Sequence, residues 1–333
     1  MQLKKIICVL LLFMLQMSTV YADSYCVISG KDNTVIDEKN MNEPQSVASI
    51  SKIMTAIIAI EQGNLKDTWV CGEELKQAYG SLLYLKEGDK VSLQSMLYGL
   101  MLRSGNDAAL EIAVHIAKSE AAFVKLMNEK AQEIGMLNTE FHNASGLDEQ
   151  DGGNISTAYD MALLMSYAMK NETFRTITST TYYTNESDLR WKNKNRLLFE
   201  YPFTNGGKTG YTKKAGRTLV TSAAYQDTES IVVTLKTADD FEFHKEKHQE
   251  TFSQYDTIVL LKKGTYHCDG RKFKIDQDVC VTVKKDGTTK IETAIHVEKG
   301  QLIVEVQKKG HVDVYTYKEN KDKKSSLFGS VHL

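Results

Sequence analysis

Strand-like segments lie at both ends of a long helical stretch, and this arrangement constrains the fold more than any other feature. Residues 25–28 and 34–37 are short β-like runs separated by a polar Gly-Lys-Asp-Asn turn, which predicts a hairpin. Residues 217–225 and 230–236 are rich in Val, Thr and Leu and predict a second strand pair. We therefore expect an α+β fold, in which both ends of one domain build an antiparallel sheet that packs with helices.

Helical patterns fill the stretch between the two strand groups. A helix that begins at Ser49 is apolar nearly all round, so it is expected to be buried. Residues 92–103 and 107–117 predict two more helices, separated by a short polar break. A helix over residues 241–261 is expected to close this unit, which also holds an all-helical subdomain.

The pattern changes after residue 264. Short strands are predicted by alternating Val residues at 279, 281 and 283 and by the runs 291–297, 302–306 and 312–317, which glycines separate. This spacing indicates a small all-β module. The expected division is residues 23–262 for the first domain, 263–318 for the β domain and 319–333 for a short tail.

The N-terminus has the layout of a secretory signal peptide. Lys4 and Lys5 precede an apolar run over residues 6–15, and Ala22 offers a small residue before the expected cleavage point. An uncut anchor is the alternative, but the apolar core is much shorter than the roughly 20 residues that span a bilayer. We expect export of residues 23–333 without a transmembrane segment. A net charge of −2 gives no indication of a nucleic-acid partner.

Four cysteines remain after residue 22, and export permits disulfides among them. Cys268 and Cys280 lie close in sequence and are the candidate pair, whereas free, buried thiols are the alternative for all four. The cysteines and histidines of the β module lack metal-ligand spacing, so neither a metal nor a cofactor is expected.

Ser49 and Lys52 stand three residues apart at the start of the buried helix. Residues i and i+3 share one face of a helix, so the lysine nitrogen can reach the serine oxygen. A buried lysine loses proton affinity and, as a neutral amine, can take the serine proton. This spacing predicts an activated nucleophile, although chance alone supplies it often.

Two later tripeptides complete a set. Ser104-Gly105-Asn106 forms the polar break between two helices, and Lys208-Thr209-Gly210 precedes the second strand pair. A strand edge that carries Lys and Thr, with Gly leaving room for a ligand backbone, suits the capture of an extended peptide that ends in a carboxylate. Taken alone, the first reads as a capped loop and the second as a glycine-rich turn.

Together and in this order, S-x-x-K, S-x-N and K-T-G resemble the motif set of penicillin-binding proteins and class A β-lactamases. The resemblance to low-molecular-mass serine-type D-alanyl-D-alanine carboxypeptidases extends over about residues 24–262, and the β module resembles their second domain. The segments that carry it are 48–56 (ASISKIMTA), 104–109 (SGNDAA), 143–148 (NASGLD) and 208–212 (KTGYT). The implied fold is a serine β-lactamase-like domain followed by a small β domain.

This resemblance implies a role for each motif residue in cutting a peptidoglycan stem pentapeptide. Ser49 would attack the carbonyl between the two terminal D-alanines, with Lys52 as general base. Ser104 would relay a proton to the leaving amine, and Asn106 would orient Lys52 and the substrate amide. β-Lactam antibiotics would then be covalent inhibitors at Ser49.

The K-T-G strand would bind the end of the substrate. Lys208 and Thr209 would hold the terminal carboxylate, while Gly210 leaves space for the peptide. The backbone N–H groups of Ser49 and Tyr211 would form the oxyanion hole.

Some positions depart from the family pattern. Ile50 and Ser51 replace threonines near the nucleophile. An arginine that assists carboxylate capture in relatives is missing from residues 243–247, where His244, Lys245 and Lys247 are the basic residues. Arg196 and Asp160 match recurring charged positions, and we interpret them as buried, paired and structural.

Three rivals share these motifs in whole or in part. A β-lactamase of class A needs a Glu-x-x-Leu-Asn segment, which does not occur between residues 106 and 208. An endopeptidase or transpeptidase uses the same three motifs and differs only in the acceptor. A non-catalytic wall-binding protein has no need of an intact nucleophile set. The expected location is extracytoplasmic, at the cell wall or the outer face of the membrane.

Overall fold

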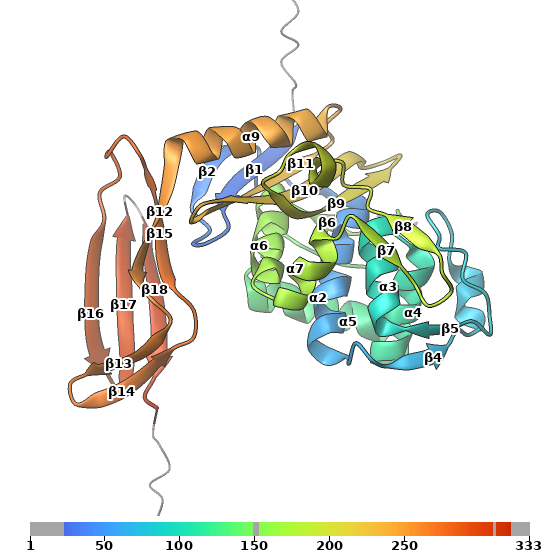
Figure 1. The fold of residues 1–333 in the computed structure, drawn as a ribbon, viewed down its shortest axis with the longest axis horizontal. Helices are drawn as coiled ribbons and strands as arrows, with labels where there is room; N and C mark the ends of the chain where they lie inside the picture. The colour runs from blue at the N-terminus through green and yellow to red at the C-terminus, as the bar shows by residue number, and fades with distance from the viewer. Residues whose placement is uncertain (1–22, 149–152, 309–310, 321–333) are drawn as a thin grey trace, which may run out of the picture. The chain divides into compact units, whose positions relative to one another are not determined.

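The computed structural model describes residues 23–148, 153–308 and 311–320, and it divides the chain into two compact units (Figure 1). The first unit ends at Ser253 and the second begins at Gln254. The predicted signal peptide at residues 1–22 and nearly all of the predicted tail lie outside the described residues. No helix within the described ranges combines the length and hydropathy that crossing a membrane requires.

A five-stranded sheet forms the framework of the first unit, in the order β2-β1-β11-β10-β9 with every neighbouring pair antiparallel. The strands are β1 Ser24–Ser29, β2 Val35–Lys39, β9 Thr204–Thr212, β10 Gly216–Tyr225 and β11 Thr228–Leu235. Strands from both ends of the domain therefore meet in one sheet, which confirms the α+β prediction. β9 is an edge strand, so one side of its backbone is open to a partner.

Helices lie on both faces of this sheet, and the remaining helices of the first unit lie beyond it (Figure 1). They are α2 Lys52–Gln62 with the preceding 3₁₀ turn η1 Ala48–Ser51, α3 Leu93–Tyr98, the π-helix η3 Gly99–Arg103, α4 Asn106–Ala117, α5 Glu120–Ile134, α6 Ala158–Met169, α7 Glu172–Ser179, α8 Leu197–Glu200 and α9 Asp240–Gln254. A 3₁₀ turn η2 Glu73–Gln77 and the short strand pairs β3 Gln45–Ser46 with β6 Ile155–Ser156, β4 Thr68–Val70 with β5 Lys90–Ser92, and β7 Tyr182–Thr184 with β8 Arg190–Lys192 connect them.

The alternation of side chains along β10 explains how both faces are covered. Val220 belongs to the large core shared with α2 and α6, whereas Leu219 and Ala223 pack in a smaller cluster with Phe241 and Phe252 of α9. Residues two apart on a strand point to the same face. α9 therefore covers the face opposite α6 and α7 (Figure 1).

The second unit is all β and has its own core. Its strands are β12 Tyr255–Leu261 paired with β15 Val279–Lys284, the hairpin β13 Gly264–Cys268 with β14 Arg271–Ile275, and the sheet β16 Glu292–Glu298, β17 Gln301–Lys308 and β18 His311–Lys318. Its core consists of Phe273, Ile275, Val279, Val281, Leu302, Val304 and Val306. This agrees with the predicted β module, to which the structure adds β12, β13 and β14.

The structure differs from two expectations, the end of one helix and the candidate disulfide. The helix predicted over 241–261 ends at Gln254, and Tyr255–Leu261 is a strand of the second unit, so the units divide after Ser253 rather than after residue 262. No disulfide joins any two of the four described cysteines, so the candidate Cys268–Cys280 bond does not form.

Candidate active site

Ser49 and Lys52 meet where the 3₁₀ turn η1 passes into α2. Lys52 Nζ donates to Ser49 Oγ at 3.0 Å, as their spacing predicts. The lysine side chain is fully buried, whereas Ser49 is half-buried. The turn begins with Ala48 in the left-handed region at φ 51°, and Ile50 is buried beneath it. The nucleophile candidate therefore keeps an open side while its partner is shielded from water.

Two further oxygens bind the Lys52 ammonium. Asn106 Oδ1 accepts from Nζ at 2.7 Å, and the carbonyl oxygen of Ser145 is a third acceptor. The pKa of Lys52 is lowered to about 7, chiefly by burial and also by the positive charge of Lys194, while the negative charge of Asp107 opposes both. A large fraction of Lys52 is therefore neutral near pH 7, which is the form that can take a proton from Ser49.

Ser104 lies at the end of the π-helix that precedes α4. Its backbone is left-handed, at φ 65°, so the chain breaks there and Asn106 begins the next helix. Lys208 Nζ donates to Ser104 Oγ at 3.0 Å and to the Thr209 carbonyl at 2.6 Å. Burial, with Lys52 and Lys194 adding to it, places the pKa of Lys208 well below its ordinary value.

Gly210 permits the close approach of β9 to the nucleophile turn. A Cβ at this position would lie 3.0 Å from Ser49 N and 2.3 Å from Thr218 Oγ1. Thr218 Oγ1 donates to the Val47 carbonyl at 3.0 Å and so joins the sheet to the residues before Ser49. Tyr211 follows in the same edge strand and is 68 % exposed.

The predicted site residues are thus brought to one place. Ser49, Lys52 and Asn106 form one hydrogen-bonded group, and Ser104, Lys208 and Thr209 form a second. Ser104 and Asn106 belong to one turn, and Gly210 of β9 packs against Ser49, so the two groups adjoin. Groups of His, Cys, Asp and Glu that could hold a metal do not occur among the described residues.

Sequence reasoning missed two contributors. The Ser145 carbonyl contacts both Lys52 Nζ and Ser49 Oγ, the latter at 3.5 Å. Its loop is fixed by Asn143 and by Gly146, whose φ is 77° and whose Cβ would lie 2.1 Å from the Ala48 carbonyl. The NASGLD resemblance pointed to this loop without assigning it a contact. Lys194 belongs to no motif; its charge acts on Lys52 and Lys208, and its Nζ donates to Ser81 Oγ at 3.0 Å.

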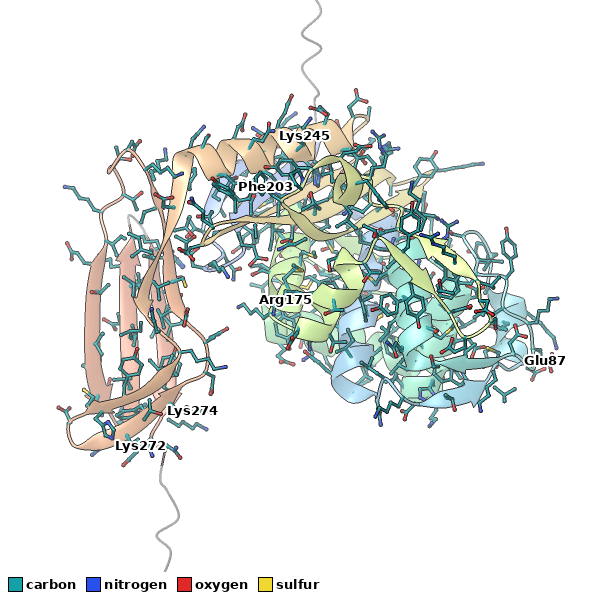
Figure 2. The ribbon with its side chains drawn as sticks, in the orientation of Figure 1. Glu87, Arg175, Phe203, Lys245, Lys272 and Lys274 are labelled. Carbon is teal, nitrogen blue, oxygen red and sulfur yellow. The ribbon has the colours of Figure 1, made fainter. Side chains whose placement is uncertain are left out.

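The three basic residues considered in place of the missing arginine belong to α9, on the opposite face of the sheet (Figure 2). His244 is fully buried between Thr221 and Thr234. Lys245 pairs with Glu242, and Lys247 pairs with Asp37 and Glu250. All three side chains therefore have partners within α9 or on the strands and residues that pack against it.

The expectation that Arg196 is buried is wrong. Its guanidinium is exposed, pairs with Glu200 at 3.0 Å and lies over the Phe241 ring. Asp160 is buried as expected, but its carboxylate accepts from Asn138 N and Thr139 Oγ1, both at 2.8 Å, rather than from a cation. Both residues have structural partners away from Ser49.

Comparison with known proteins identifies the family and the fold. A family model described as D-alanyl-D-alanine carboxypeptidase matches residues 13–239. The D-alanyl-D-alanine carboxypeptidase DacF of Bacillus subtilis is 35 % identical over 259 residues, 73 % of this chain and 65 % of that protein. The chain thus spans slightly less than two thirds of that relative's length.

Solved structures have the same fold. Penicillin-binding protein 5 of Haemophilus influenzae has a TM-score of 0.75 at 23 % identity and covers 92 % of this chain and 99 % of its own, which supports the fold alone. A mutant of a Streptomyces DD-transpeptidase matches with a TM-score of 0.66 at 28 % identity. The match covers 71 % of this chain and 99 % of the transpeptidase chain. With the family match over more than half its length, this chain belongs to the D-alanyl-D-alanine carboxypeptidase family.

Proposed function

We propose that this protein is a serine-type D-alanyl-D-alanine carboxypeptidase that removes the terminal D-alanine from peptidoglycan stem pentapeptides. The observation that carries the proposal is the position of the Lys52 ammonium nitrogen between Ser49 Oγ and Asn106 Oδ1. A shielded amine with a pKa of about 7 beside a half-exposed hydroxyl suits nucleophilic acyl transfer at neutral pH. Family membership supplies the substrate class.

Acylation follows from these contacts. Ser49 Oγ attacks the carbonyl carbon between the two D-alanines as Lys52 takes the hydroxyl proton. The backbone N–H groups of Ser49 and Tyr211 stabilise the oxyanion, where one such donor lowers the barrier by roughly 3 kcal/mol. When the C–N bond breaks, Ser104 relays a proton to the leaving amine of D-alanine. Water then hydrolyses the Ser49 ester and restores the free hydroxyl.

Recognition of the terminal carboxylate is assigned to Lys208 and Thr209. Lys208 is buried and its pKa is well below the ordinary value without an anion beside it. An incoming carboxylate favours the charged ammonium and forms a charge-assisted hydrogen bond with it. Gly210 lets an extended peptide lie along the edge strand β9.

A DD-transpeptidase is the second candidate, because a Streptomyces protein of that name has the same fold at 28 % identity. Both activities pass through the Ser49 acyl-enzyme and differ in whether water or an amine accepts the acyl group. β-Lactams, which resemble the acyl donor, are expected to acylate the same serine. These substrates imply work outside the cytoplasm, at the cell wall, after export.

Incubation with a synthetic pentapeptide that ends in D-Ala-D-Ala separates these activities. The proposal predicts one free D-alanine per peptide and a tetrapeptide product, both lost in Ser49→Ala. Cross-linked dimers as the main product when an amine acceptor is present would assign a transpeptidase. A peptide that stays intact with the wild-type protein would contradict both.

A further inference from the structure

Residues 79–85 lie against the Ser104-Gly105-Asn106 turn, and one carboxylate fixes them there. Asp107 is 2 % exposed and accepts from Leu83 N at 2.8 and 3.0 Å and from Leu85 N at 3.2 Å. The Leu83 side chain packs over Gly105, where an added Cβ would lie 2.7 Å from Leu83 Cγ. A buried carboxylate with several N–H donors is a strong local anchor.

The anchored segment holds the outer end of the Asn106 side chain. Asn106 Nδ2 donates to the Tyr79 carbonyl at 2.6 Å, and Asn106 N donates to the Ser81 carbonyl at 2.7 Å. Oδ1 of the same amide accepts from Lys52 Nζ at 2.7 Å. A carboxamide has one accepting end and one donating end, so the Tyr79 carbonyl dictates that oxygen faces Lys52. A flipped amide would direct its NH₂ group at an ammonium.

Gly80 shows how closely this contact is fitted. Its φ is 83°, and a Cβ there would lie 3.0 Å from Asn106 Nδ2. Both the backbone conformation and the contact therefore disfavour a side chain beside the amide. The 79–85 segment is therefore in direct contact with the Asn106 amide.

We propose that Asp107 is a positioning residue for acyl transfer: by fixing residues 79–85 it sets the orientation of the Asn106 amide that binds Lys52. The inference rests on the proposed function of Ser49 and Lys52 and assigns a role that the three motifs leave open. The charged groups that act on Lys52 are Lys194 and Asp107, and those that act on Lys208 are Lys52 and Lys194.

The test compares Asp107→Asn with the matched variant Asp89→Asn. Asp89 accepts from Lys86 N at 2.8 Å, just beyond the same segment, but has no bond to Asn106. The measurement is the second-order rate of acylation by benzylpenicillin from pH 5 to pH 9. For Asp107→Asn we expect a rate lower by roughly tenfold to a hundredfold, as for a misplaced catalytic group. The acidic limb should also move to lower pH, because an anion that raises the pKa of Lys52 is removed. Asp89→Asn should match the wild type.

Gly80→Ala tests the same contact between residues 79–85 and the Asn106 amide by changing the segment instead of Asp107. It should also slow acylation, and its effect should not add to that of Asp107→Asn, because both act through one amide. Melting temperatures verify that each variant is folded. A wild-type rate and pH profile in Asp107→Asn, or fully additive effects, would overturn the inference. Failure of the wild-type protein to be acylated would instead contradict the proposed function.

Discussion

At the residue scale, burial rather than spacing gives Lys52 its chemistry. The three-residue interval from Ser49 places the amine within reach, but many serines and lysines share that interval without reacting. The structure adds a fully buried side chain with two acceptors besides Ser49, the Asn106 amide and the Ser145 carbonyl. Burial penalises the charged form, so the amine can act as a base at a pH where an exposed lysine is fully protonated.

The pH dependence of acylation follows from this. The pKa of Lys52 is lowered from 10.5 to about 7, so the neutral base is abundant above pH 7 and scarce below it. We expect the rate of acylation by a β-lactam to fall about tenfold per pH unit well below pH 7, as one proton titrates. Stopped-flow measurement of acylation between pH 5 and pH 9 tests this. A rate that still rises about tenfold per pH unit up to pH 9 would contradict the assignment.

Glu111 is a second buried ionisable group, away from the reacting atoms. It is 1 % exposed, and Oε2 accepts from Trp69 Nε1 at 2.7 Å. Burial raises its pKa. Because the folded-state pKa lies above the unfolded value, the neutral acid stabilises the fold at low pH, and that contribution is lost as pH rises through the folded-state pKa.

We therefore expect Glu111→Gln to gain stability relative to the wild type as pH rises from 4 to 8, by roughly 1 kcal/mol. Urea unfolding at several pH values measures this difference. Glu87→Gln is the control, because Glu87 is exposed at the periphery of the first unit (Figure 2). A stability difference that does not change with pH would contradict the account.

At the element scale, a chain of hydrogen bonds joins α9 to the sheet and has a fixed direction. Thr251 Oγ1 donates to the Lys247 carbonyl at 2.8 Å, so it accepts from Ser230 Oγ at 3.3 Å. The hydroxyl proton of Ser230 points to Thr251, so Ser230 Oγ must accept from His248 Nδ1 at 3.0 Å. His248 is therefore protonated on Nδ1, and its Nε2 is an acceptor.

The direction continues to the second histidine. His248 Nε2 accepts from Thr221 Oγ1 at 2.8 Å, so Thr221 accepts from His244 Nδ1 at 2.7 Å. His244 Nε2 then accepts from Thr234 Oγ1 at 2.9 Å. Both imidazoles are neutral in this arrangement, and a second proton on either ring would meet a hydroxyl that already donates to it.

These histidines predict acid sensitivity. Burial lowers the pKa of His248 to about 3 and that of His244 well below its ordinary value. The unfolded chain binds protons first, so their contribution is complete above about pH 6.5 and is lost as pH falls below it. We expect the free energy of unfolding to drop by roughly 2 kcal/mol for each ring between pH 6.5 and pH 4.5, within the limit of 1.36 kcal/mol per unit of pKa shift. His248→Gln should weaken that slope, and an unchanged slope would contradict it.

The conformation of the Gly146 loop affects both the stability of the fold and the geometry of the active site. Gly146→Ala should place a methyl group against the Ala48 carbonyl and strain a backbone at φ 77°. We expect it to reduce both acylation and melting temperature, because the loop presents the Ser145 carbonyl to Lys52. Gly88→Ala is a control for backbone strain alone, since its φ is 93° and its Cβ would meet nothing within 4 Å. Equal acylation rates in the two variants would contradict the role of this loop.

Much of the fold and site could be predicted from local patterns. The strand pairs of the first sheet and the buried helix at Ser49 follow from periodicity, and the three motifs identify the site. The helix prediction is wrong over Tyr255–Leu261, because an apolar run of this length fits a helix as well as a strand. The partner strand β15 lies beyond a hairpin in sequence, so the local pattern does not indicate the pairing. The Ser145 contact uses a backbone oxygen, which any residue type supplies, so residue identity could not reveal it.

At the scale of the whole molecule, the two units have separate cores. The first unit buries a large cluster around α2, α4 and α6, and the second buries seven apolar residues of its own. Separate cores often unfold as separate cooperative transitions. Acylation of Ser49 should therefore stabilise the transition of the first unit only.

Calorimetry of the full chain tests this with Val304→Ala, which truncates a side chain that is 1 % exposed in the second core. We expect a loss of roughly 1–2 kcal/mol in the second transition from the removed methyl groups. The acylation rate and the shift of the first transition by benzylpenicillin should stay at wild-type values. A single transition that moves with both changes would contradict two separate cores.

The central claim is that Ser49 forms the acyl-enzyme, and one measurement tests it most directly. The protein is incubated with benzylpenicillin, and its intact mass is measured by mass spectrometry. A proteolytic digest then locates the adduct on one peptide. The account predicts a single adduct on the peptide that carries Ser49, absent in Ser49→Ala and strongly slowed in Lys52→Gln. An adduct on another residue, or none with the wild-type protein, would contradict it.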